Sequence, residues 1–301
     1  MNCFKRNLLP FTLLVALTVI HPAEARQSNL IAEGAELTLQ SARFTFTEGP
    51  ATDSEGNIYF TDQPDNKIWK YSTGGELSLF MENAGRSNGM YFDNDGHLLT
   101  CADEKNEIWS ISPEGEVSVL VASFKEQRLN GPNDLWVHPD GGIYFTDPYY
   151  QREYWSHNEK EIDEERVYYI TPDRSEIRIA ADGLVRPNGI IGTPDGKTLY
   201  VADIDDRKTY SYTILPDGSL TDRKLFAEPG SDGMTIDEQG NIYLTGDGVL
   251  VFDSSGRQIE HIEVPENWTA NVTFGGADRK TLFVTAMSGI YTLRMNVKGV
   301  R

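Results

Sequence analysis

Hydrophobic and polar positions alternate along this chain in short segments that are separated by polar turn sequences. The apolar segments are rich in Ile, Tyr, Phe and Val, and turns such as SEGN, NDG, PDGG, PDGK and EQGN lie between them. Runs of β-branched and aromatic residues on either side of Gly, Asn and Asp turns are typical of β-hairpins. The pattern therefore predicts an all-β protein.

This hairpin pattern occurs six times. Most copies end their second apolar run in Thr-Asp or Ala-Asp, as in EGPATDSEGNIYFTD and PNDLWVHPDGGIYFTD. Aligned by one polar residue near their start, the copies are anchored at Glu48, Asn88, Asn133, Asn188, Asp232 and Asn271, with steps of 40, 45, 55, 44 and 39 residues. Repeats of about 20 to 50 residues are typical of solenoids and propellers.

Each repeat has room for four strands. Two further strand-like pieces usually follow the hairpin, as in KIWKYS, the turn TGGE, and LSLFME. These features predict a six-bladed β-propeller with four-stranded antiparallel blades. The last repeat has room for only three strands, whereas the segment AELTLQ near Ala35 precedes the first repeat. We therefore expect the N-terminal strand to complete the sixth blade and close a single domain over residues 26–301.

Residues 1–25 have the pattern of a secretory signal peptide. Two basic residues precede the apolar run from Leu8 to Ile20, and the small-residue pattern Ala-Glu-Ala follows at 23–25. The apolar run is shorter than a transmembrane helix requires. We expect a secreted protein, located in a bacterial periplasm, that has no membrane contact after cleavage.

The charge balance limits the partners of this chain. It carries 46 acidic and 27 basic residues, a formal net charge of −19. Such an excess of acid disfavours binding to nucleic acid or to an anionic membrane surface, and it is compatible with binding a cation. We expect a monomer or a weak homodimer.

The six aligned positions place oxygen-bearing side chains at one end of the propeller channel. The first strand of each blade lines the channel, so the residue just before it lies at the channel mouth. The second strand returns to the same face, one strand further out. It places there a second set of acids, which comprises Asp62, Asp103, Asp147, Asp203 and, with less regular sequence, Asp247.

Carboxylate and carboxamide oxygens are ligands for a hard cation, and the Cys and His grouping of a structural zinc site is missing from this set. We expect one divalent ion, with Ca²⁺ as first choice and Zn²⁺, Mg²⁺ or Mn²⁺ as alternatives. A different interpretation applies above all to Asn88 and Asn271, because Asn and Asp also occupy left-handed turn positions without binding anything. Glu48 does not fit that turn pattern.

Several motifs give the chain a family resemblance. They are EGP at Glu48, RLNGPNDL from Arg128, FTDPYY from Phe145, RPNGI from Arg186 and SDGM at Ser231. With these motifs the chain resembles the senescence marker protein, gluconolactonase and luciferin-regenerating enzyme family of six-bladed propellers. The resemblance covers essentially the whole mature chain.

The resemblance implies roles for particular residues. Glu48, Asn188 and Asp232 match the metal ligands of the family. Asn133 matches a residue that contacts substrate and often the metal. Substrate contact is also implied for an Arg just upstream, which Arg128 matches only if a small insertion is allowed, and this leaves the choice between Asn130 and Asn133 open.

The implied activity is the hydrolysis of a small lactone, such as gluconolactone, by metal-activated water. Asp232 would serve as both ligand and general base. The sequence has no Gly-x-Ser-x-Gly elbow and no His-Glu-x-x-His motif, so it gives no local support to a serine hydrolase or a zincin. Two alternatives stay open, namely a hydrolase of other esters or phosphotriesters, and a propeller that binds a ligand without catalysis.

The long third repeat contains an insertion after its second strand, from Tyr149 to Glu165. Because that strand ends at the channel mouth, we expect the insertion to lie beside Asn133 and the metal. Its aromatic residues, Tyr149 among them, are suited to stacking on a sugar ring. The insertion is therefore predicted to be a lid or rim that binds substrate, with an ordinary solvated loop as the alternative.

Overall fold

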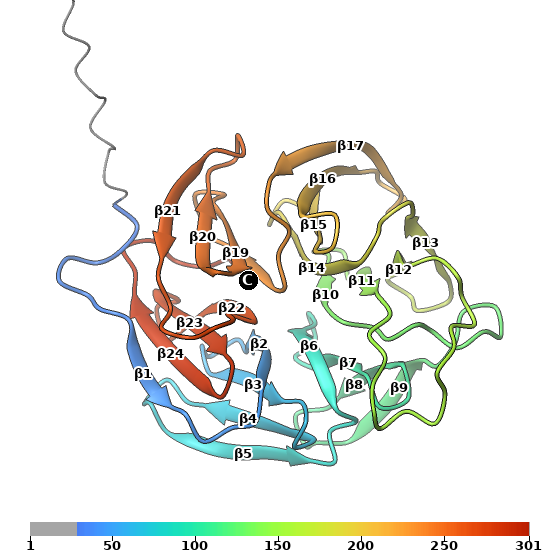
Figure 1. Cartoon of the computed structure of the whole chain (residues 1–301), viewed down its shortest axis with the longest axis horizontal. Coiled ribbons are helices and arrows are strands. Elements are labelled where there is room, and N and C mark those ends of the chain that lie inside the picture. The colour runs from blue at the N-terminus through green and yellow to red at the C-terminus, as the bar shows by residue number, and fades with distance from the viewer. Residues whose placement is uncertain (1–28, 301) are drawn as a thin grey trace, which may run out of the picture.

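The computed structural model describes residues 29–300, and the predicted signal peptide, residues 1–25, lies outside this range. The described residues form 24 strands and no helix. The strands make six four-stranded antiparallel sheets that surround a central axis, as Figure 1 shows. The prediction of an all-β, six-bladed propeller is confirmed. Within residues 29–300 there is accordingly no helix that could cross a membrane.

The innermost strand of every blade begins within a few residues of one of the six aligned polar positions. These strands are β2 (Thr47–Thr52), β6 (Ser87–Phe92), β10 (Leu135–Val137), β14 (Pro187–Gly192), β18 (Met234–Ile236) and β22 (Asn271–Gly275). The repeat alignment therefore correctly identified the strand that lines the channel in each blade.

The remaining strands follow outward in chain order. The second strands are β3 (Ile58–Asp62), β7 (Leu98–Ala102), β11 (Ile143–Asp147), β15 (Thr198–Asp203), β19 (Ile242–Gly246) and β23 (Thr281–Ala286). The third strands are β4 (Lys67–Tyr71), β8 (Glu107–Ile111), β12 (Arg166–Ile170), β16 (Lys208–Ile214), β20 (Gly248–Phe252) and β24 (Gly289–Arg294). The outer strands are β5 (Leu77–Glu82), β9 (Val117–Val121), β13 (Ile177–Ala181), β17 (Leu220–Ala227), β21 (Gln258–Ile262) and β1 (Thr38–Ser41).

The N-terminal strand closes the ring as predicted. Strand β1 pairs with β24 in antiparallel register, with Thr38 opposite Thr292 and Leu39 opposite Tyr291. It is the outer strand of the sheet that otherwise holds the last three strands of the chain. Pairing the two ends of the chain covers an edge of β24 that would otherwise be exposed.

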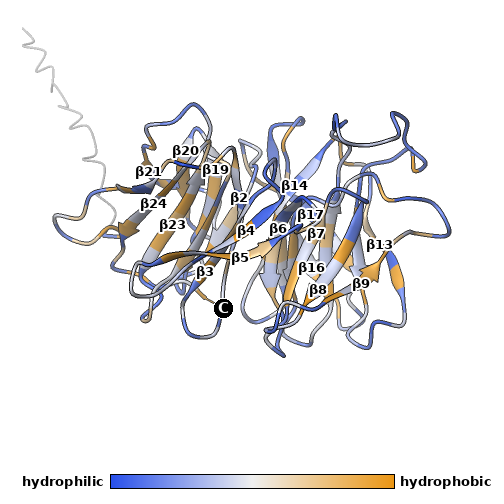
Figure 2. Cartoon of the chain, turned by 90° about the horizontal axis from the view of Figure 1, so that it is seen from below, coloured by the Kyte–Doolittle hydropathy of each residue, from blue (hydrophilic) through white to orange (hydrophobic). Residues whose placement is uncertain are grey.

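The core of the propeller lies between the blades. Figure 2 shows apolar residues, in orange, along strands on both sides of the ring, and the second strands β3 and β11 are buried over their whole length. A blade is packed by neighbours on both faces, so its inner strands need apolar residues at consecutive positions. One such contact joins blades three and four, where a Cβ on Gly192 would lie 2.2 Å from the Trp136 ring. A side chain larger than hydrogen would therefore separate these two blades.

Candidate functional site

A polar cavity opens at the mouth of the channel. It is lined by Phe46, Glu48, Gln63, Asn88, Asn133, Tyr150, Arg152, Asn188, Ile204, Asp232 and Trp268. All four predicted metal residues, Glu48, Asn133, Asn188 and Asp232, are in this lining. Residues from five different blades are therefore brought together, and the four predicted metal residues among them are up to 184 positions apart, from Glu48 to Asp232.

The aligned residues are not left-handed turn residues. A positive φ occurs at several Asn and Asp positions of residues 29–300, but at none of the six aligned ones. The turn interpretation of Asn88 and Asn271 is therefore wrong. Asn88 lines the cavity, whereas Asn271 lies deeper and donates through Nδ2 to Glu48 Oε2 at 3.3 Å.

A Gly follows four of the aligned residues, and these glycines allow neighbouring strands to come into close contact. A Cβ on Gly89 would lie 2.3 Å from Asp134 Oδ1, and one on Gly233 would lie 2.0 Å from Cγ of Asn271. Neighbouring innermost strands approach so closely around the axis that a side chain would force them apart. The Asn-Gly and Asp-Gly dipeptides thus hold the polar residues in a narrow ring.

Two acidic side chains share this site. Glu48 is 3% exposed, and its pKa is raised well above the ordinary value by burial, by the Asp232 carboxylate and by Asp134. Burial also raises the pKa of Asp232, while hydrogen bonds from Trp268 and Asn188 and the charge of Arg152 lower it. Buried carboxylates that repel one another are stabilised by a cation bound between them.

Asn188 has one half of its carboxamide free. Its Nδ2 donates to the Tyr150 hydroxyl at 3.0 Å. Its Oδ1 is buried and accepts no hydrogen bond from any residue in 29–300. Buried side-chain oxygens without a partner are uncommon in folded proteins, so this atom is suited to a ligand in the cavity.

The described residues contain no group of three or more Asp, Glu, His or Cys side chains placed to hold a metal ion. A cation at the channel mouth would therefore depend on carboxamide oxygens in addition to Glu48 and Asp232. Neutral carboxamides and carboxylates together suit a hard ion such as Ca²⁺ and do not suit a soft one.

The loop from Tyr149 to Glu165 lies on the predicted face, because Tyr150 and Arg152 line the cavity. Its aromatic residues do not form the stacking surface that we expected, since Tyr150 alone among them is in the lining. Trp155 is buried and donates through Nε1 to the Asp103 carbonyl oxygen at 2.7 Å. Most of the aromatic side chains anchor the loop and are not displayed to a ligand.

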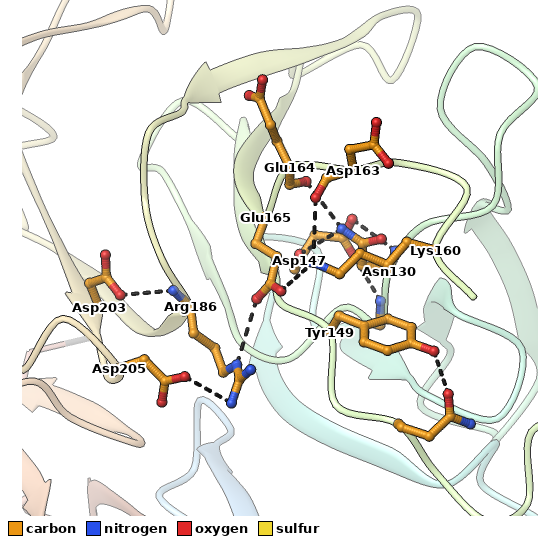
Figure 3. Close-up of polar contacts among 12 residues, drawn as sticks. Asn130, Asp147, Tyr149, Lys160, Asp163, Glu164, Glu165, Arg186, Asp203 and Asp205 are labelled. Carbon is orange, nitrogen blue, oxygen red and sulfur yellow. Dashed lines mark hydrogen bonds and ion pairs between the residues drawn. The ribbon is translucent and has the colours of Figure 1, made fainter. Parts of the chain in front are cut away.

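Three predicted substrate residues lie outside the lining. Arg128 pairs with Glu161 at 2.7 Å. Asn130 donates through Nδ2 to the Glu164 carbonyl oxygen at 3.1 Å. The hydroxyl of Tyr149 donates to Gln151, and Figure 3 shows Asn130 beside Asp147 and Tyr149 directed toward that neighbouring amide. All three side chains hold the loop in place.

The sequence interpretation missed Arg152 and Trp268 as site residues. Arg152 belongs to the insertion, but nothing in the sequence distinguishes it from the other charged residues there. Trp268 precedes the sixth repeat and donates through Nε1 to Asp232 Oδ2 at 2.6 Å. Its position before Asn271, in the loop that enters an innermost strand, was the one available signal, because such loops border the channel mouth.

The second-strand acids lie around the site as predicted, and three of them make the same type of contact, each in its own blade. Asp62, Asp147 and Asp203 each accept main-chain N–H groups from the loop that leads into the innermost strand of their own blade. The main chain of that loop is thereby fixed. The acid of blade two, Asp103, makes side-chain contacts with the insertion and with Gln63 instead.

Fold and site together define a six-bladed propeller with an acidic, oxygen-lined cavity at one end of its channel. A family model described as the SMP-30/gluconolactonase/LRE-like region matches residues 46–288. The chain belongs to this family.

Individual relatives agree with this assignment. A gluconolactonase of Zymomonas mobilis is 29% identical over 285 residues, which cover 84% of this chain and 80% of the relative. The solved structure of a gluconolactonase from Xanthomonas campestris is similar with a TM-score of 0.82 and 29% identity, covering 89% of this chain and 91% of that one. A calcium-binding protein, regucalcin, from Agrobacterium tumefaciens has a TM-score of 0.72 at 20% identity, covering 90% and 96% of the two chains, and shares the fold.

Proposed function

We propose that this protein hydrolyses a small sugar lactone with the help of one divalent metal ion, Ca²⁺ being the first choice. The observation that carries the proposal is the arrangement of Glu48, Asn133, Asn188 and Asp232 around one cavity, with the Asn188 Oδ1 atom unpartnered. Family membership and the gluconolactonase names of two relatives support the reaction. The calcium-binding description of regucalcin supports the ion.

The residues of the cavity fit such an ion. Glu48 and Asp232 would supply two negative charges, and Asn133 and Asn188 would supply neutral oxygens. An ion held there would polarise the lactone carbonyl and stabilise the oxyanion that forms on attack by water.

Asp232 has a second role in this proposal. Trp268 occupies its Oδ2 atom, so Oδ1 is the atom that takes the proton of the attacking water. Tyr150 lies in the same cavity, and burial, followed by the Asp232 charge, raises the pKa of its phenol. The hydroxyl therefore keeps its proton and can donate to a substrate oxygen while it accepts from Asn188.

Arg128, Asn130 and Tyr149 are not part of the proposed substrate contacts, because their side chains are engaged in the anchoring of the insertion. We also propose that the protein is exported to a bacterial periplasm and that it is a monomer or a weak homodimer. Both can be tested by fractionation of cells that express the full chain and by light scattering of the mature protein.

The decisive experiment measures metal content and activity in the same samples. Wild-type protein is stripped with chelator, reloaded with Ca²⁺, Zn²⁺, Mg²⁺ or Mn²⁺, and assayed with gluconolactone, an aryl ester and a phosphotriester by proton release. The proposal requires metal-restored lactone hydrolysis that Asp232→Ala abolishes. Asp247→Ala is the matched control, because Asp247 is exposed at the corresponding end of β19 and outside the cavity lining. Full activity in stripped protein, or none in any reloaded sample, would refute it.

A further inference from the structure

Arg152 is the one basic residue in the cavity lining of the described chain. Its Nε donates to Asp103 Oδ2 at 2.9 Å, and its guanidinium lies 5.4 Å from the centre of the Tyr150 ring. No residue between 29 and 300 accepts a hydrogen bond from either of its terminal nitrogens. The edge of the guanidinium that matches a carboxylate in two parallel hydrogen bonds is therefore available.

Asp103 is dedicated to holding this arginine and its loop. It is 2% exposed, and its carboxylate accepts from Arg152, from the Tyr154 hydroxyl and from Gln63 Nε2 at 3.2 Å. The corresponding acids of blades one, three and four bind the main chain of their own loops. In blade two the equivalent residue, Asp103, instead accepts hydrogen bonds from side chains of other blades, Arg152 among them.

Tyr150 completes the support of Arg152. Two arginines contact its ring, since the Arg186 guanidinium also lies over it, 4.9 Å from the ring centre. Arg186 is neutralised by Asp205 at 2.9 Å and lies near Glu165 at 3.7 Å, as Figure 3 shows. Arg186 is outside the cavity lining, so the two arginines differ in their access to a ligand.

The position of Arg152 is costly for a site that takes only a metal and a neutral lactone. Asp103 balances the charge of Arg152 through its Nε atom, but the two terminal nitrogens of this cavity-lining side chain have no protein acceptor, and hydrogen-bond donors left without an acceptor are costly. The cost is offset when the ligand itself carries a negative charge. A planar guanidinium with two free nitrogens matches the two oxygens of a carboxylate, as it also matches those of a phosphate.

We propose that Arg152 recognises a carboxylate on the substrate, so that the preferred substrates are lactones that retain a second acid group away from the ring carbonyl, such as aldaric acid monolactones. Asp103 is its positioning residue. The inference rests on the proposed lactonase function for its enzymatic part, but recognition of the carboxylate can be measured without turnover.

The first test is binding. Calcium-loaded wild-type protein is titrated calorimetrically with an aldarate, which has two carboxylates, and with the matching aldonate, which has one. We expect the aldarate to bind about 10- to 100-fold more tightly, in line with a charged hydrogen-bonded pair. Arg152→Gln should remove this preference and Arg152→Lys should keep part of it. Equal affinities in the wild type would overturn the inference.

The second test is kinetic. The ratio of kcat/KM for an aldaric monolactone to that for an aldonolactone should fall about 10- to 100-fold in Arg152→Gln, chiefly through KM. Arg186→Gln is the matched control and should keep the wild-type ratio. A proportional loss on both substrates in Arg152→Gln would refute the inference while lactonase activity stands. Binding discrimination without hydrolysis of either lactone would instead refute the proposed function and leave the recognition intact.

The positioning role of Asp103 has its own signature. Asp103→Asn should lower the same ratio, and the double variant with Arg152→Gln should lose no more than Arg152→Gln alone, because both changes remove one interaction. Additive losses would assign Asp103 a purely structural role. Thermal unfolding of each variant shows whether it is folded, and Arg152→Lys provides the comparison if the glutamine variant is not.

Discussion

Trp268 Nε1 lies 2.6 Å from Oδ2 of Asp232, and this contact orients the acid at the channel mouth. The indole comes from the loop between β21 and β22, whereas Asp232 precedes β18. The bond leaves Asp232 with one oxygen directed by a fixed donor and one oxygen for other partners. It also lowers the pKa of the Asp232 carboxyl against the effect of burial.

Replacing Trp268 with Phe should therefore reduce turnover. Loss of one hydrogen bond to a charged group costs about 1.5 to 3 kcal/mol, so we expect kcat to fall at least about 10-fold. Metal affinity should change less than kcat, because the variant keeps all four proposed ligands. Trp109→Phe is a matched control, since Trp109 makes a similar 2.6 Å bond to Glu107 on strand β8. Equal kinetic losses in both variants would show that the effect is not specific to Asp232.

Glu48→Gln should have opposite effects on the stability of the metal-free protein and on metal binding. Burial and the neighbouring acids raise the pKa of Glu48 well above its ordinary value, so removing its charge relieves repulsion in the stripped protein and should raise its Tm. The same change removes a charged ligand and should weaken Ca²⁺ binding at least about 100-fold. Differential scanning calorimetry and calcium titration measure the two effects. A lower Tm in the stripped variant would contradict this account.

The pH dependence of stability should carry the signature of Asp147. Burial raises its pKa to about 7, although the N–H groups of Gly131 and Asn130 oppose the shift. An unfolded Asp has a pKa near 3.9. Between about pH 4 and pH 7 the folded protein thus holds a proton that the unfolded chain has lost, and stability falls as pH rises through this window at up to about 1.4 kcal/mol per unit.

Asp147→Asn removes this titration. The free energy of unfolding of the wild type, relative to the variant, should drop by about 3 kcal/mol between pH 5 and pH 8 in chelator. Carboxyls common to both proteins cancel in the comparison. Urea denaturation at four pH values in this range provides the measurement, and a difference that stays constant with pH would mean that the Asp147 carboxyl does not titrate there.

The sequence predicted the ring of blades and the closing strand because each depends on local alternation and on repeat length. It also predicted the convergence of Glu48, Asn133, Asn188 and Asp232, since equivalent positions of a propeller meet at the axis. The sequence did not show whether the Asn-Gly and Asp-Gly dipeptides form turns or allow neighbouring innermost strands to approach closely around the axis. Both need a Gly, and only the approach of the neighbouring strand at Gly89 and Gly233 separates the two.

The loop contacts could not be predicted in the same way. The insertion has no counterpart in the other repeats, so nothing in the alignment indicates which of its side chains point inward. Tyr149 and Trp155 look equally suited to stacking in the sequence, and packing decides between burial and display. Arg152 faces the cavity because Asp103, a residue of another blade, accepts a hydrogen bond from its Nε atom.

The anchoring of the insertion leads to the last prediction, which concerns Trp155→Ala. Trp155 is 8% exposed, donates to the Asp103 carbonyl oxygen and lies 4.8 Å from the His157 ring in a stacked contact. Removing a buried indole costs about 3 to 5 kcal/mol, and the loss falls on a loop that is attached to the ring at both ends. The loop should therefore open locally while the blades stay folded, because their cores lie between the sheets.

The expected result is faster cleavage by a Glu-specific protease between Tyr149 and Glu165, where five glutamates offer sites. KM should rise, because Tyr150 and Arg152 lose their fixed positions beside Asp232, while calcium affinity stays close to that of the wild type. His157→Ala removes the ring stack alone and should change proteolysis much less. If Trp155→Ala also lost its calcium affinity, the insertion would be part of the structure that holds the ligand ring together, and it could not be a rim that acts on substrate alone.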